Sequence, residues 1–385
     1  ECIVPGANAR EGGEIPGIRV RGAENILEIM HFLMTRGEER DRVLPRTFVD
    51  TESLFAETER DGGLQGRPDF AEVTGQETAR RGAEIAAAGF HNLLMVGPPG
   101  AGKSMIARRI PGILPPLTLE ESLEVTSVVS VAGLLEEGEA LVTGRPFRSP
   151  HHTISQAALI GGSTAPKPGM ISLAHRGVLF LDELPEFQRA SLDALRQPLE
   201  ERRVTISRVS GNVTYPSDFM LVFAMTPCPC GYYPDRARCS CTRPQVHRYM
   251  GKVSGPILDR IDLCVELAAV DYDSLKSRAK AESSAEIRGR VERARRIQEE
   301  RFRGTSTRFN GDIEVSAMER YCGLGEEQQR CMERLYGSLQ LSARAYHRIL
   351  RVARTIADLE GAEEIGTAHL MEASYYRPSM EYWGN

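Results

Sequence analysis

A glycine-rich run in the first third of the chain has the residue types and spacing that bind phosphate. It is Gly-Pro-Pro-Gly-Ala-Gly-Lys-Ser over 97–104, which matches the phosphate-binding loop pattern at every fixed position. Its glycines let backbone N–H groups face the phosphates, Lys103 would bring a charge to the β- and γ-phosphates, and Ser104 would bind Mg²⁺. A chance glycine-rich turn is the alternative, and the apolar run before the motif argues against it. The residues expected to bind ATP are Gly97, Pro98, Pro99, Gly100, Ala101, Gly102, Lys103, Ser104 and Met105.

Two adjacent carboxylates, Asp182 and Glu183, follow the apolar run Val-Leu-Phe-Leu at 178–181. That run predicts a buried strand adjacent to the phosphate loop, and ligands of open α/β sheets bind at the carboxyl ends of the strands. Asp182 would then hold Mg²⁺ through water, and Glu183 would orient and deprotonate the attacking water. The alternative is that both acids are simply exposed to solvent at the end of a strand. The phosphate-binding pattern upstream argues against this alternative.

Three further polar residues complete the expected catalytic set. Thr226 follows an apolar run and would hydrogen-bond the attacking water or the γ-phosphate. Arg260 precedes a short strand and would act as an arginine finger on the ATP of a neighbouring subunit. Arg344 opens a helix and would touch the γ-phosphate within its own chain. For both arginines, a surface ion pair is the preferred interpretation unless a family resemblance supports the catalytic one.

Four of the eight cysteines form two close pairs, Cys228 with Cys230 and Cys239 with Cys241. Four thiolates can close a tetrahedral Zn²⁺ site, and no catalytic base or open ligand position is evident, so the pattern favours structural zinc. Only one residue separates the members of each pair, where two or more are usual, so metal-free thiols and an iron–sulfur cluster stay open. The other cysteines are scattered, which favours a cytoplasmic protein over a disulfide framework.

The elements around these residues predict an α/β fold with a parallel sheet over 69–273, followed by a small all-helical lid domain over 274–385. This is the arrangement of AAA+ P-loop NTPases. Buried strands are expected at 93–96, 178–181 and 221–224, and helices at 76–88 and 105–110. The helices expected in the lid span 275–303, 313–321, 326–340, 343–360 and 367–375.

The beginning of the chain differs from the rest. It starts with Glu rather than Met, so residues 1–45 are expected to be the remnant of another domain. Within them, residues 25–34 predict a helix whose apolar face has no evident partner. The polar stretch that follows, 46–68, predicts a linker.

The net charge of −5 argues against a generally basic nucleic-acid binder but not against local basic surfaces. No apolar stretch approaches the length of a membrane span.

Longer stretches resemble one protein family. Residues 145–155 and 166–174 resemble the magnesium-chelatase-like branch of AAA+ proteins, and the cysteine pairs, 252–262 and 342–357 resemble the ComM/YifB family within it. The resemblance implies a hexameric ring driven by ATP, with DNA in its pore, which acts as a branch-migration helicase in homologous recombination and natural transformation. It also implies an N-terminal domain of Lon-protease-like fold, of which 1–45 would be the remnant. The family often has Asn where this chain has Thr226.

Two inserts in the α/β domain are candidates for contact with single-stranded or branched DNA. Residues 202–216 predict a hairpin with β-branched strands on both sides of a Ser-Gly-Asn turn, and the resemblance places a pore hairpin there. Arg208, near its tip, would meet DNA phosphates. The second insert, 139–176, resembles the helix-2 insert of the same branch. Its basic residues are Arg145, Arg148 and Lys167. The alternative is that both inserts only seal contacts between subunits.

Two other classes of function stay open. A chelatase subunit would drive Mg²⁺ insertion into a porphyrin together with partner proteins, although the cysteine pairs and the short N-terminal region point away from it. A protein remodeller would use the same ring on a polypeptide. The adjacent His151 and His152 are more typical of structural hydrogen bonding than of metal ligands.

Overall fold

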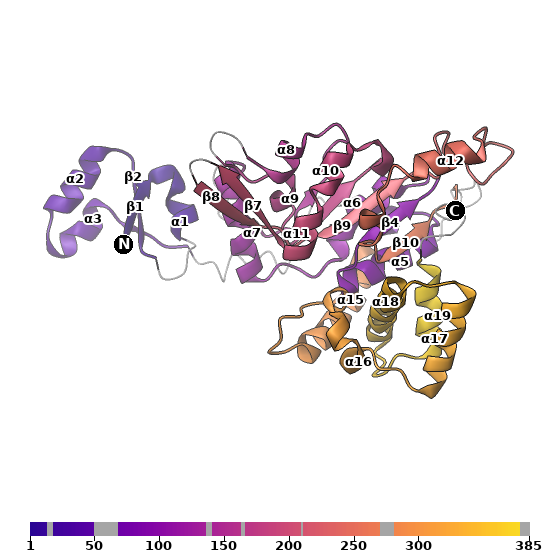
Figure 1. The fold of residues 1–385 in the computed structure, drawn as a ribbon. Helices are drawn as coiled ribbons and strands as arrows, with labels where there is room; N and C mark the ends of the chain where they lie inside the picture. The colour runs from indigo at the N-terminus through magenta and orange to yellow at the C-terminus, as the bar shows by residue number, and fades with distance from the viewer. Residues whose placement is uncertain are drawn as a thin grey trace. The chain divides into compact units, whose positions relative to one another are not determined.

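The computed structural model describes residues 1–13, 18–49, 68–135, 141–162, 166–208, 211–269 and 281–377, without the side chains of Glu38 and Arg208. The chain divides into two compact units, which are Glu1–Gln65 with Pro116–Arg145, and Gly66–Pro115 with Pro146–Asn385. Figure 1 shows the elements of both in the order of the sequence. Most of the linker expected at 46–68 lies outside the described residues.

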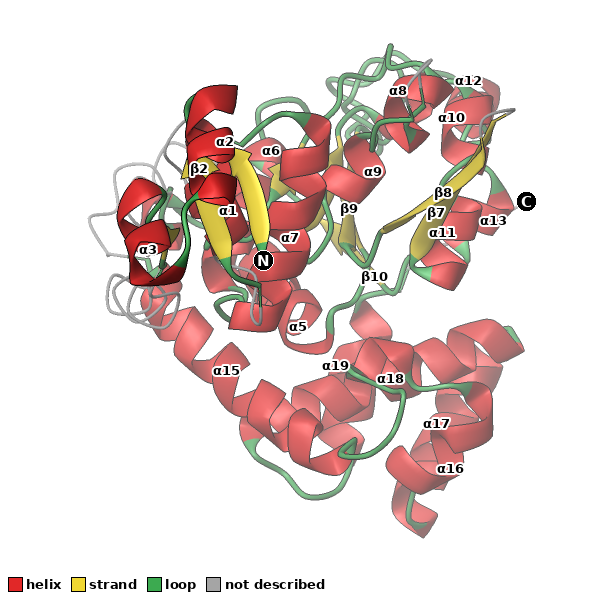
Figure 2. Ribbon diagram, turned by 90° about the vertical axis from the view of Figure 1, so that its left-hand side faces the viewer, coloured by secondary structure: helices red, strands yellow, loops and turns green. Residues whose placement is uncertain are grey.

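The first unit contains a three-stranded sheet in the order β1-β2-β3, with β1 parallel and β3 antiparallel to β2. Figure 2 labels its central strand, β2. One small cluster of buried apolar residues in this unit contains Ala23, Phe32 and Leu44. The strands are β1 (Cys2–Pro5), β2 (Val20–Ala23) and β3 (Arg46–Thr47). The helices are η1 (Gly6–Asn8), α1 (Ala9–Gly13), α2 (Ile26–Met34), η2 (Gly37–Glu39), α3 (Arg40–Val43) and α7 (Leu119–Ala132).

Helix α2 confirms the helix expected over 25–34. Asn25 caps it, because its side chain accepts hydrogen bonds from two backbone N–H groups of the first turn. Only Phe32 of this helix is buried, whereas Leu27 and Leu33 are 71% and 62% exposed. The apolar face of α2 therefore remains largely in contact with solvent.

Five parallel strands in the order β10-β4-β9-β6-β5 form the centre of the second unit. They confirm the predicted α/β class. Because both faces of a parallel sheet are covered, alternate residues of β4 pack on opposite sides, Leu93 and Met95 on one and Leu94 and Val96 on the other. The strands are β4 (Leu93–Val96), β5 (Phe147–Arg148), β6 (Val178–Leu181), β9 (Met220–Met225) and β10 (Leu263–Glu266).

Strand β6 ends beside the phosphate loop, as expected, but it does not pair directly with β4, the strand that leads into that loop. Strand β9 lies between β4 and β6, pairing Leu93 with Val222 on one side and Leu179 with Leu221 on the other. All three strands are parallel, so their carboxyl ends still meet at one edge of the sheet. The short edge strand β5, which pairs with β6, was not anticipated.

Helices cover both faces of the sheet. On one side α5 and α6 pack together and against α15, and α5 also packs against α18 (Figure 1). These helices are α5 (Glu77–Gly89), α6 (Lys103–Ile113), α15 (Ser284–Arg301) and α18 (Ala343–Glu360). The remaining helices before the lid are η3 (Phe70–Glu72), α8 (Gln156–Ile160), α9 (Met170–Leu173), η4 (Leu184–Glu186), α10 (Arg189–Asp193), α11 (Arg196–Glu201), α12 (Arg243–Met250) and α13 (Gly255–Leu258).

Residues 281–377 form a helical region, as predicted, and contain no strand. The first helix was expected over 275–303, of which 275–280 lie outside the described residues. Helix α15 begins at Ser284, where Ser283 and Glu286 form a capping box. Buried polar contacts join this domain to the sheet layer. Gln298 donates to the carbonyl of Ala88 at 3.0 Å. The other elements are η5 (Asn310–Asp312), η6 (Val315–Ala317), α16 (Met318–Tyr321), α17 (Glu326–Ser338) and α19 (Thr367–Tyr375).

The predicted hairpin is confirmed as β7 (Arg203–Arg208) and β8 (Gly211–Pro216). One face packs on the core through Val204, Ile206 and Tyr215. Its register pairs Arg208 with Gly211 at the tip, while Val209 and Ser210 lie outside the described residues. The hairpin leads directly into β9, so its base is fixed to the strand at the centre of the sheet.

Candidate nucleotide site

The phosphate loop has the strand–loop–helix context that its motif requires. Strand β4 ends at Val96 and α6 begins at Lys103. Gly100 and Gly102 have φ angles of +76° and +90°, a left-handed conformation that glycine adopts without strain. Gly102 caps α6, so the positive end of the helix faces the loop, as an anion site needs.

The side chain of Lys103 contacts the backbone of its own phosphate loop. Its side-chain amine donates to the carbonyl oxygens of Gly97 at 2.7 Å and Pro98 at 2.9 Å. Burial lowers the pKa of Lys103, and the nearby Asp182 carboxylate opposes that shift. A buried cation held only by neutral carbonyls is well placed to gain from an incoming polyphosphate.

Ser104 and Asp182 meet although they come from different elements. The Ser104 hydroxyl donates to Asp182 Oδ2 at 2.6 Å, which brings the two expected Mg²⁺ ligands side by side. The other carboxylate oxygen accepts the backbone N–H of Glu183 at 2.9 Å. Neighbouring hydroxyl and carboxylate oxygens are ligands that Mg²⁺ prefers, so these residues fit the ion.

Glu183 differs from its neighbour in conformation and contacts. Its φ is 53°, and its side chain is 64% exposed. One carboxylate oxygen lies 3.0 Å from Nδ1 of His152, whose ring also stacks on His151 with centroids 4.1 Å apart. The expectation of structural hydrogen bonding holds for His151, which contacts Thr153 at 2.9 Å. The contact of His152 with Glu183 was not anticipated.

Thr226 follows the end of β9, the strand between the other two. Its hydroxyl donates to the carbonyl of Cys228 at 3.1 Å and lies 2.9 Å from the hydroxyl of Tyr249. Burial raises the pKa of Tyr249. Thr226 has one hydroxyl proton and donates it to the carbonyl of Cys228. In the hydrogen bond between the two hydroxyls, Tyr249 is therefore the donor. One lone pair on Thr226 is then left to accept a hydrogen.

A cavity of about 720 Å³ joins these groups. Residues from the loops after β4, β6 and β9 line it, together with residues of α12 and the turn that follows it. Sequence reasoning missed the α12 side, because no motif marks it. The lining residues are Pro99, Gly100, Lys103, Ser104, Asp182, Glu183, Glu186, Met225, Thr226, Pro229, Gln245, Arg248, Tyr249 and Lys252.

The two catalytic arginines expected from the sequence do not line this cavity. Arg260 lies just before β10, as predicted, where it forms an ion pair with Glu200 and donates to the carbonyl of Pro256 at 2.7 Å. Arg344 opens α18, as predicted, and forms an ion pair with Asp259. Its side chain is 74% exposed. The single chain thus holds both arginines in ion pairs outside the cavity.

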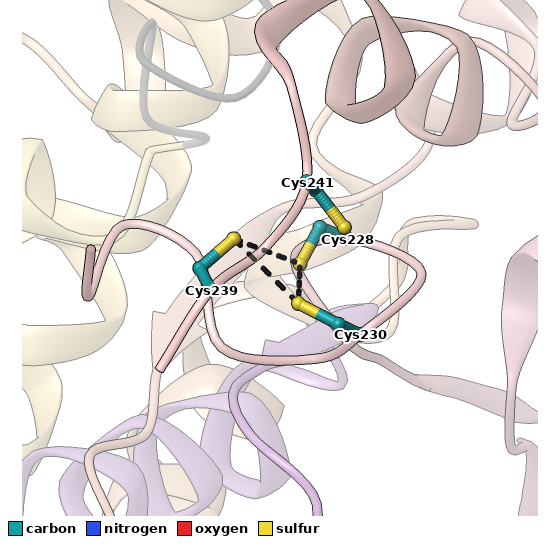
Figure 3. Close-up of side chains that lie close together, drawn as sticks. All are labelled: Cys228, Cys230, Cys239 and Cys241. Carbon is teal, nitrogen blue, oxygen red and sulfur yellow. Dashed lines mark hydrogen bonds between the residues drawn. The ribbon is translucent and has the colours of Figure 1, made fainter. Parts of the chain in front are cut away.

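The four clustered cysteines converge on one point (Figure 3). Their sulfur atoms all lie within 4.8 Å of one another. The Sγ atom of Cys228 lies 3.3 Å from that of Cys230 and 3.8 Å from that of Cys239, and Cys230 and Cys239 are 3.6 Å apart. Zn–S bonds of about 2.3 Å in a tetrahedron place sulfurs about 3.8 Å apart, so the arrangement fits a tetrahedral ion. A disulfide would need a much shorter distance.

The surroundings of the cluster favour the thiolate form of Cys230, whereas burial raises the pKa of Cys239. Burial also acts to raise the pKa of Cys230, but the backbone N–H of Tyr232 and the neighbouring thiols stabilise the thiolate and bring the pKa to about 6. Thiolates, not thiols, bind metal ions. Four sulfurs this close together suit a single ion better than a four-iron cluster, in which each cysteine binds a different iron atom.

The basic residues of the second insert are mostly engaged within the fold. Arg145 forms an ion pair with Glu121 at 3.1 Å. Arg148, whose pKa is lowered by burial, donates to the carbonyl of Leu173 at 3.2 Å. Lys167 is exposed. Two of the three side chains therefore have structural partners.

Within the described part of the chain, no helix combines the length and apolar character that a bilayer span requires.

Two family models match the chain. One, described as magnesium chelatase, subunit ChlI, covers residues 69–275, and the other, described as its C-terminal part, covers 281–377. Together they account for the sheet with its nucleotide cavity and for the helical domain.

Similar proteins point the same way. Competence protein ComM of Haemophilus influenzae is 42% identical over 382 residues, which is 98% of this chain and 71% of the relative. The YifB protein of Salmonella typhimurium is 46% identical over 310 residues, or 80% of this chain and 60% of the relative. The magnesium-chelatase 38 kDa subunit of Cereibacter sphaeroides is 24% identical over 336 residues, or 78% of this chain and 88% of the relative.

Proposed function

Because this chain belongs to the ComM/YifB family of magnesium-chelatase-like AAA+ proteins, we propose that it is an ATP-hydrolysing motor that acts on DNA. The observation that carries the proposal is the single cavity in which Lys103, Ser104, Asp182, Glu183 and Thr226 meet. These residues supply a phosphate charge, two oxygen ligands, a carboxylate base and a polar orienting group, which is the set that phosphoryl transfer to water needs.

In this proposal each residue has a separate task. Lys103 exchanges its two carbonyl contacts for the β- and γ-phosphates of ATP. Ser104 and Asp182 hold Mg²⁺, directly and through water, and the ion neutralises charge on the phosphates. Glu183 removes a proton from the attacking water. Thr226 orients that water by accepting one of its hydrogens, because the threonine proton is already donated to Cys228.

The two arginines would act when chains assemble into a ring. Arg260 would leave Glu200 and reach the ATP of a neighbouring subunit as an arginine finger. Arg344, exposed at the start of α18, would leave Asp259 and contact the γ-phosphate of its own chain when the helical domain closes. Both ion pairs are at least partly exposed, so exchanging them for phosphate contacts costs little.

We place DNA in the pore of a homohexameric ring, as the family resemblance implies, and assign branch migration in homologous recombination or natural transformation as the task. The hairpin β7–β8 supports this proposal, because its tip at Arg208 is joined through β9 to Thr226 at the nucleotide cavity. A strand that connects the two sites can transmit the state of the nucleotide to the DNA.

The tetracysteine module would hold one structural Zn²⁺ through Cys228, Cys230, Cys239 and Cys241. The sulfur spacing fits this ion, and no fifth ligand is needed. Elemental analysis of reduced protein should give about one zinc per chain. Protein that is freshly isolated in reductant and contains no metal would refute the assignment.

One experiment separates the classes of function. ATP hydrolysis is measured alone, with forked DNA, with single-stranded DNA, with unfolded polypeptide, and with porphyrin and Mg²⁺. A DNA motor predicts stimulation by DNA. A response to porphyrin alone would favour the chelatase function, and a response to polypeptide the remodelling function. The identity of 24% with the chelatase subunit, against 42% with ComM, makes the chelatase the less favoured candidate.

A further inference from the structure

The tetracysteine module lies against the nucleotide cavity instead of at a remote surface. It begins two residues after Thr226, and Pro229 between its first two cysteines lines the cavity. Residues 226–242 contain no helix or strand. A segment of this length without secondary structure is uncommon inside a compact domain unless it serves a site or is held by another constraint. The four converging thiols supply such a constraint.

The module holds Thr226 through its backbone. The Cys228 carbonyl accepts the proton of Thr226 at 3.1 Å, and the same carbonyl accepts the N–H of Gly231 at 2.9 Å. The turn that fixes Cys228 and Cys230 to one ion therefore also fixes the direction of the Thr226 hydroxyl. Tyr249, which also hydrogen-bonds Thr226, lies in α12, the helix that follows the last cysteine of the module.

The module also touches the phosphate loop. Gly231 has a φ of +88°, and a Cβ atom at this position would lie 2.5 Å from Cδ of Pro99. The backbone of the module is therefore in direct contact with the loop that binds the phosphates. At its other end the chain returns to the cavity, where Gln245, Arg248 and Lys252 form part of the wall.

We propose that the tetracysteine module, once it holds its metal ion, positions Thr226 and the phosphate loop for ATP hydrolysis. The metal is then required for catalysis and not only for the stability of its own loop. This inference rests on the proposed ATPase function. It assigns the cysteines as positioning residues that act through Thr226 and Pro99, because none of them needs to touch ATP.

The test measures three quantities on the full chain: zinc content, the dissociation constant for a fluorescent ATP analogue, and the turnover number for ATP. Cys239→Ser should lose zinc and lower turnover by about tenfold or more, the range expected when a group that orients a catalytic residue is lost. Cys2→Ser changes an exposed cysteine outside the cluster and should match the wild type. A zinc-free Cys239→Ser protein with wild-type turnover and affinity would overturn the proposal.

A double-mutant cycle shows whether the effect passes through Thr226. Thr226→Val should lower turnover with little change in affinity, and Thr226→Ser should restore it because the hydroxyl is kept. Once Thr226 is valine, Cys239→Ser should lower turnover only slightly further, since both changes break one unit. Effects on turnover that multiply independently would contradict positioning through Thr226.

Gly231→Ala provides a second test that keeps all four thiols, in case the cysteine variant does not fold. It should retain zinc yet weaken binding of the ATP analogue, because the new methyl group displaces Pro99. Gly304→Ala is the matched control, because Gly304 also has a positive φ, +77°, but a Cβ there meets nothing within 4 Å. Wild-type affinity in Gly231→Ala would overturn the contact with the phosphate loop. Wild-type protein that holds zinc but never hydrolyses ATP would instead refute the proposed function.

Discussion

The two adjacent acids at the end of β6 have different surroundings, and this difference supports separate roles. Asp182 is half-buried and bonded to Ser104, so it is held beside the expected Mg²⁺ ligand. Glu183 has a left-handed backbone and a side chain that is 64% exposed, so it can face a water molecule in the cavity. Two consecutive residues are thus suited to two tasks, Asp182 as an ion ligand and Glu183 as a base.

Lys103→Ala and Glu183→Gln should therefore fail in different ways. Lys103→Ala should lose tight ATP binding, because the loop loses its cation. Glu183→Gln should bind ATP as the wild type does but hydrolyse it roughly 100-fold or more slowly, as expected for loss of a general base. Titration with a fluorescent ATP analogue and measurement of phosphate release distinguish the two.

Glu186→Gln is the control, since it removes the same charge from the same cavity but leaves Glu183 in place. Its hydrolysis should stay within a few-fold of the wild type. Equal hydrolysis by Glu183→Gln and the wild type would remove Glu183 from the role of base.

His152 should matter for the rate and not for ATP binding. Its ring holds one oxygen of Glu183 at 3.0 Å, which limits the orientations of an otherwise exposed carboxylate. His152→Ala should lower turnover by about tenfold, as loss of an orienting partner does, without changing ATP affinity. His152→Gln keeps a donor and should recover part of the rate. His151→Ala loses the hydrogen bond with Thr153 and the ring contact with His152 but leaves the contact of His152 with Glu183 in place, so it is the control. A turnover unchanged or raised in His152→Ala would contradict this role.

At the scale of elements, the hairpin β7–β8 connects the tip that we propose to contact DNA to the centre of the sheet. Its base is anchored twice. Arg202 forms an ion pair with Asp312 of the helical domain, and the buried Asp218 lies 2.7 Å from Arg176. These two ion pairs connect the base of the hairpin to the helical domain and to the residues just before β6 and β9. Motion of the helical domain or of β9 would therefore move the hairpin.

Arg208→Glu should weaken DNA binding for every sequence, reduce the salt dependence of binding, and abolish DNA-stimulated but not basal ATP hydrolysis. The reason is that phosphate contacts give most of the affinity that does not depend on sequence. Arg203→Glu reverses the same charge on the same strand, at the base of the hairpin, and should have little effect. Intact DNA affinity and stimulation in Arg208→Glu rings would instead favour the hairpin as a seal between subunits.

The local patterns of the sequence predicted β4, β6 and the phosphate loop well. The two strands are short apolar runs, and the loop consists of residues with one conformational or chemical requirement, such as Gly102 at the start of α6. The same holds for α18 and α19, whose bounds match the expected 343–360 and 367–375.

The arrangement of distant elements was not predictable in the same way. The position of β9 between β4 and β6 depends on long-range packing, and all three strands are similar apolar runs. Strand β5 has only two residues, too few for a periodic pattern. The contacts of His152 with Glu183 and of Tyr249 with Thr226 join residues at unrelated spacings, so no local motif could indicate them.

At the scale of the whole molecule, assembly decides whether Arg260 is catalytic. In the single chain it contacts Glu200 and does not line its own nucleotide cavity. If Arg260 acts on a neighbour, mixing Arg260→Ala with Lys103→Ala chains should restore part of the activity that each lacks alone, because some interfaces then combine an intact arginine with an intact phosphate loop.

Arg344→Ala is the matched control for this mixing experiment. Arg344 is expected to act within its own chain, so chains with Arg344→Ala and Lys103→Ala have no intact site at any interface and should not recover. Mixed rings, verified by mass, that show no recovery with Arg260→Ala would exclude action on a neighbour.

The parallel order of the sheet has a consequence for folding. Lys103, Asp182 and Thr226 follow three different strands, and they meet only when β9 has inserted between β4 and β6. A partly folded chain therefore lacks a complete nucleotide site, so ATP would bind the native sheet and not its precursors. Ligand at 100 times its dissociation constant would stabilise the native state by about 2.7 kcal/mol. The cellular concentration of ATP would then influence how much of this chain is folded as well as how fast it works.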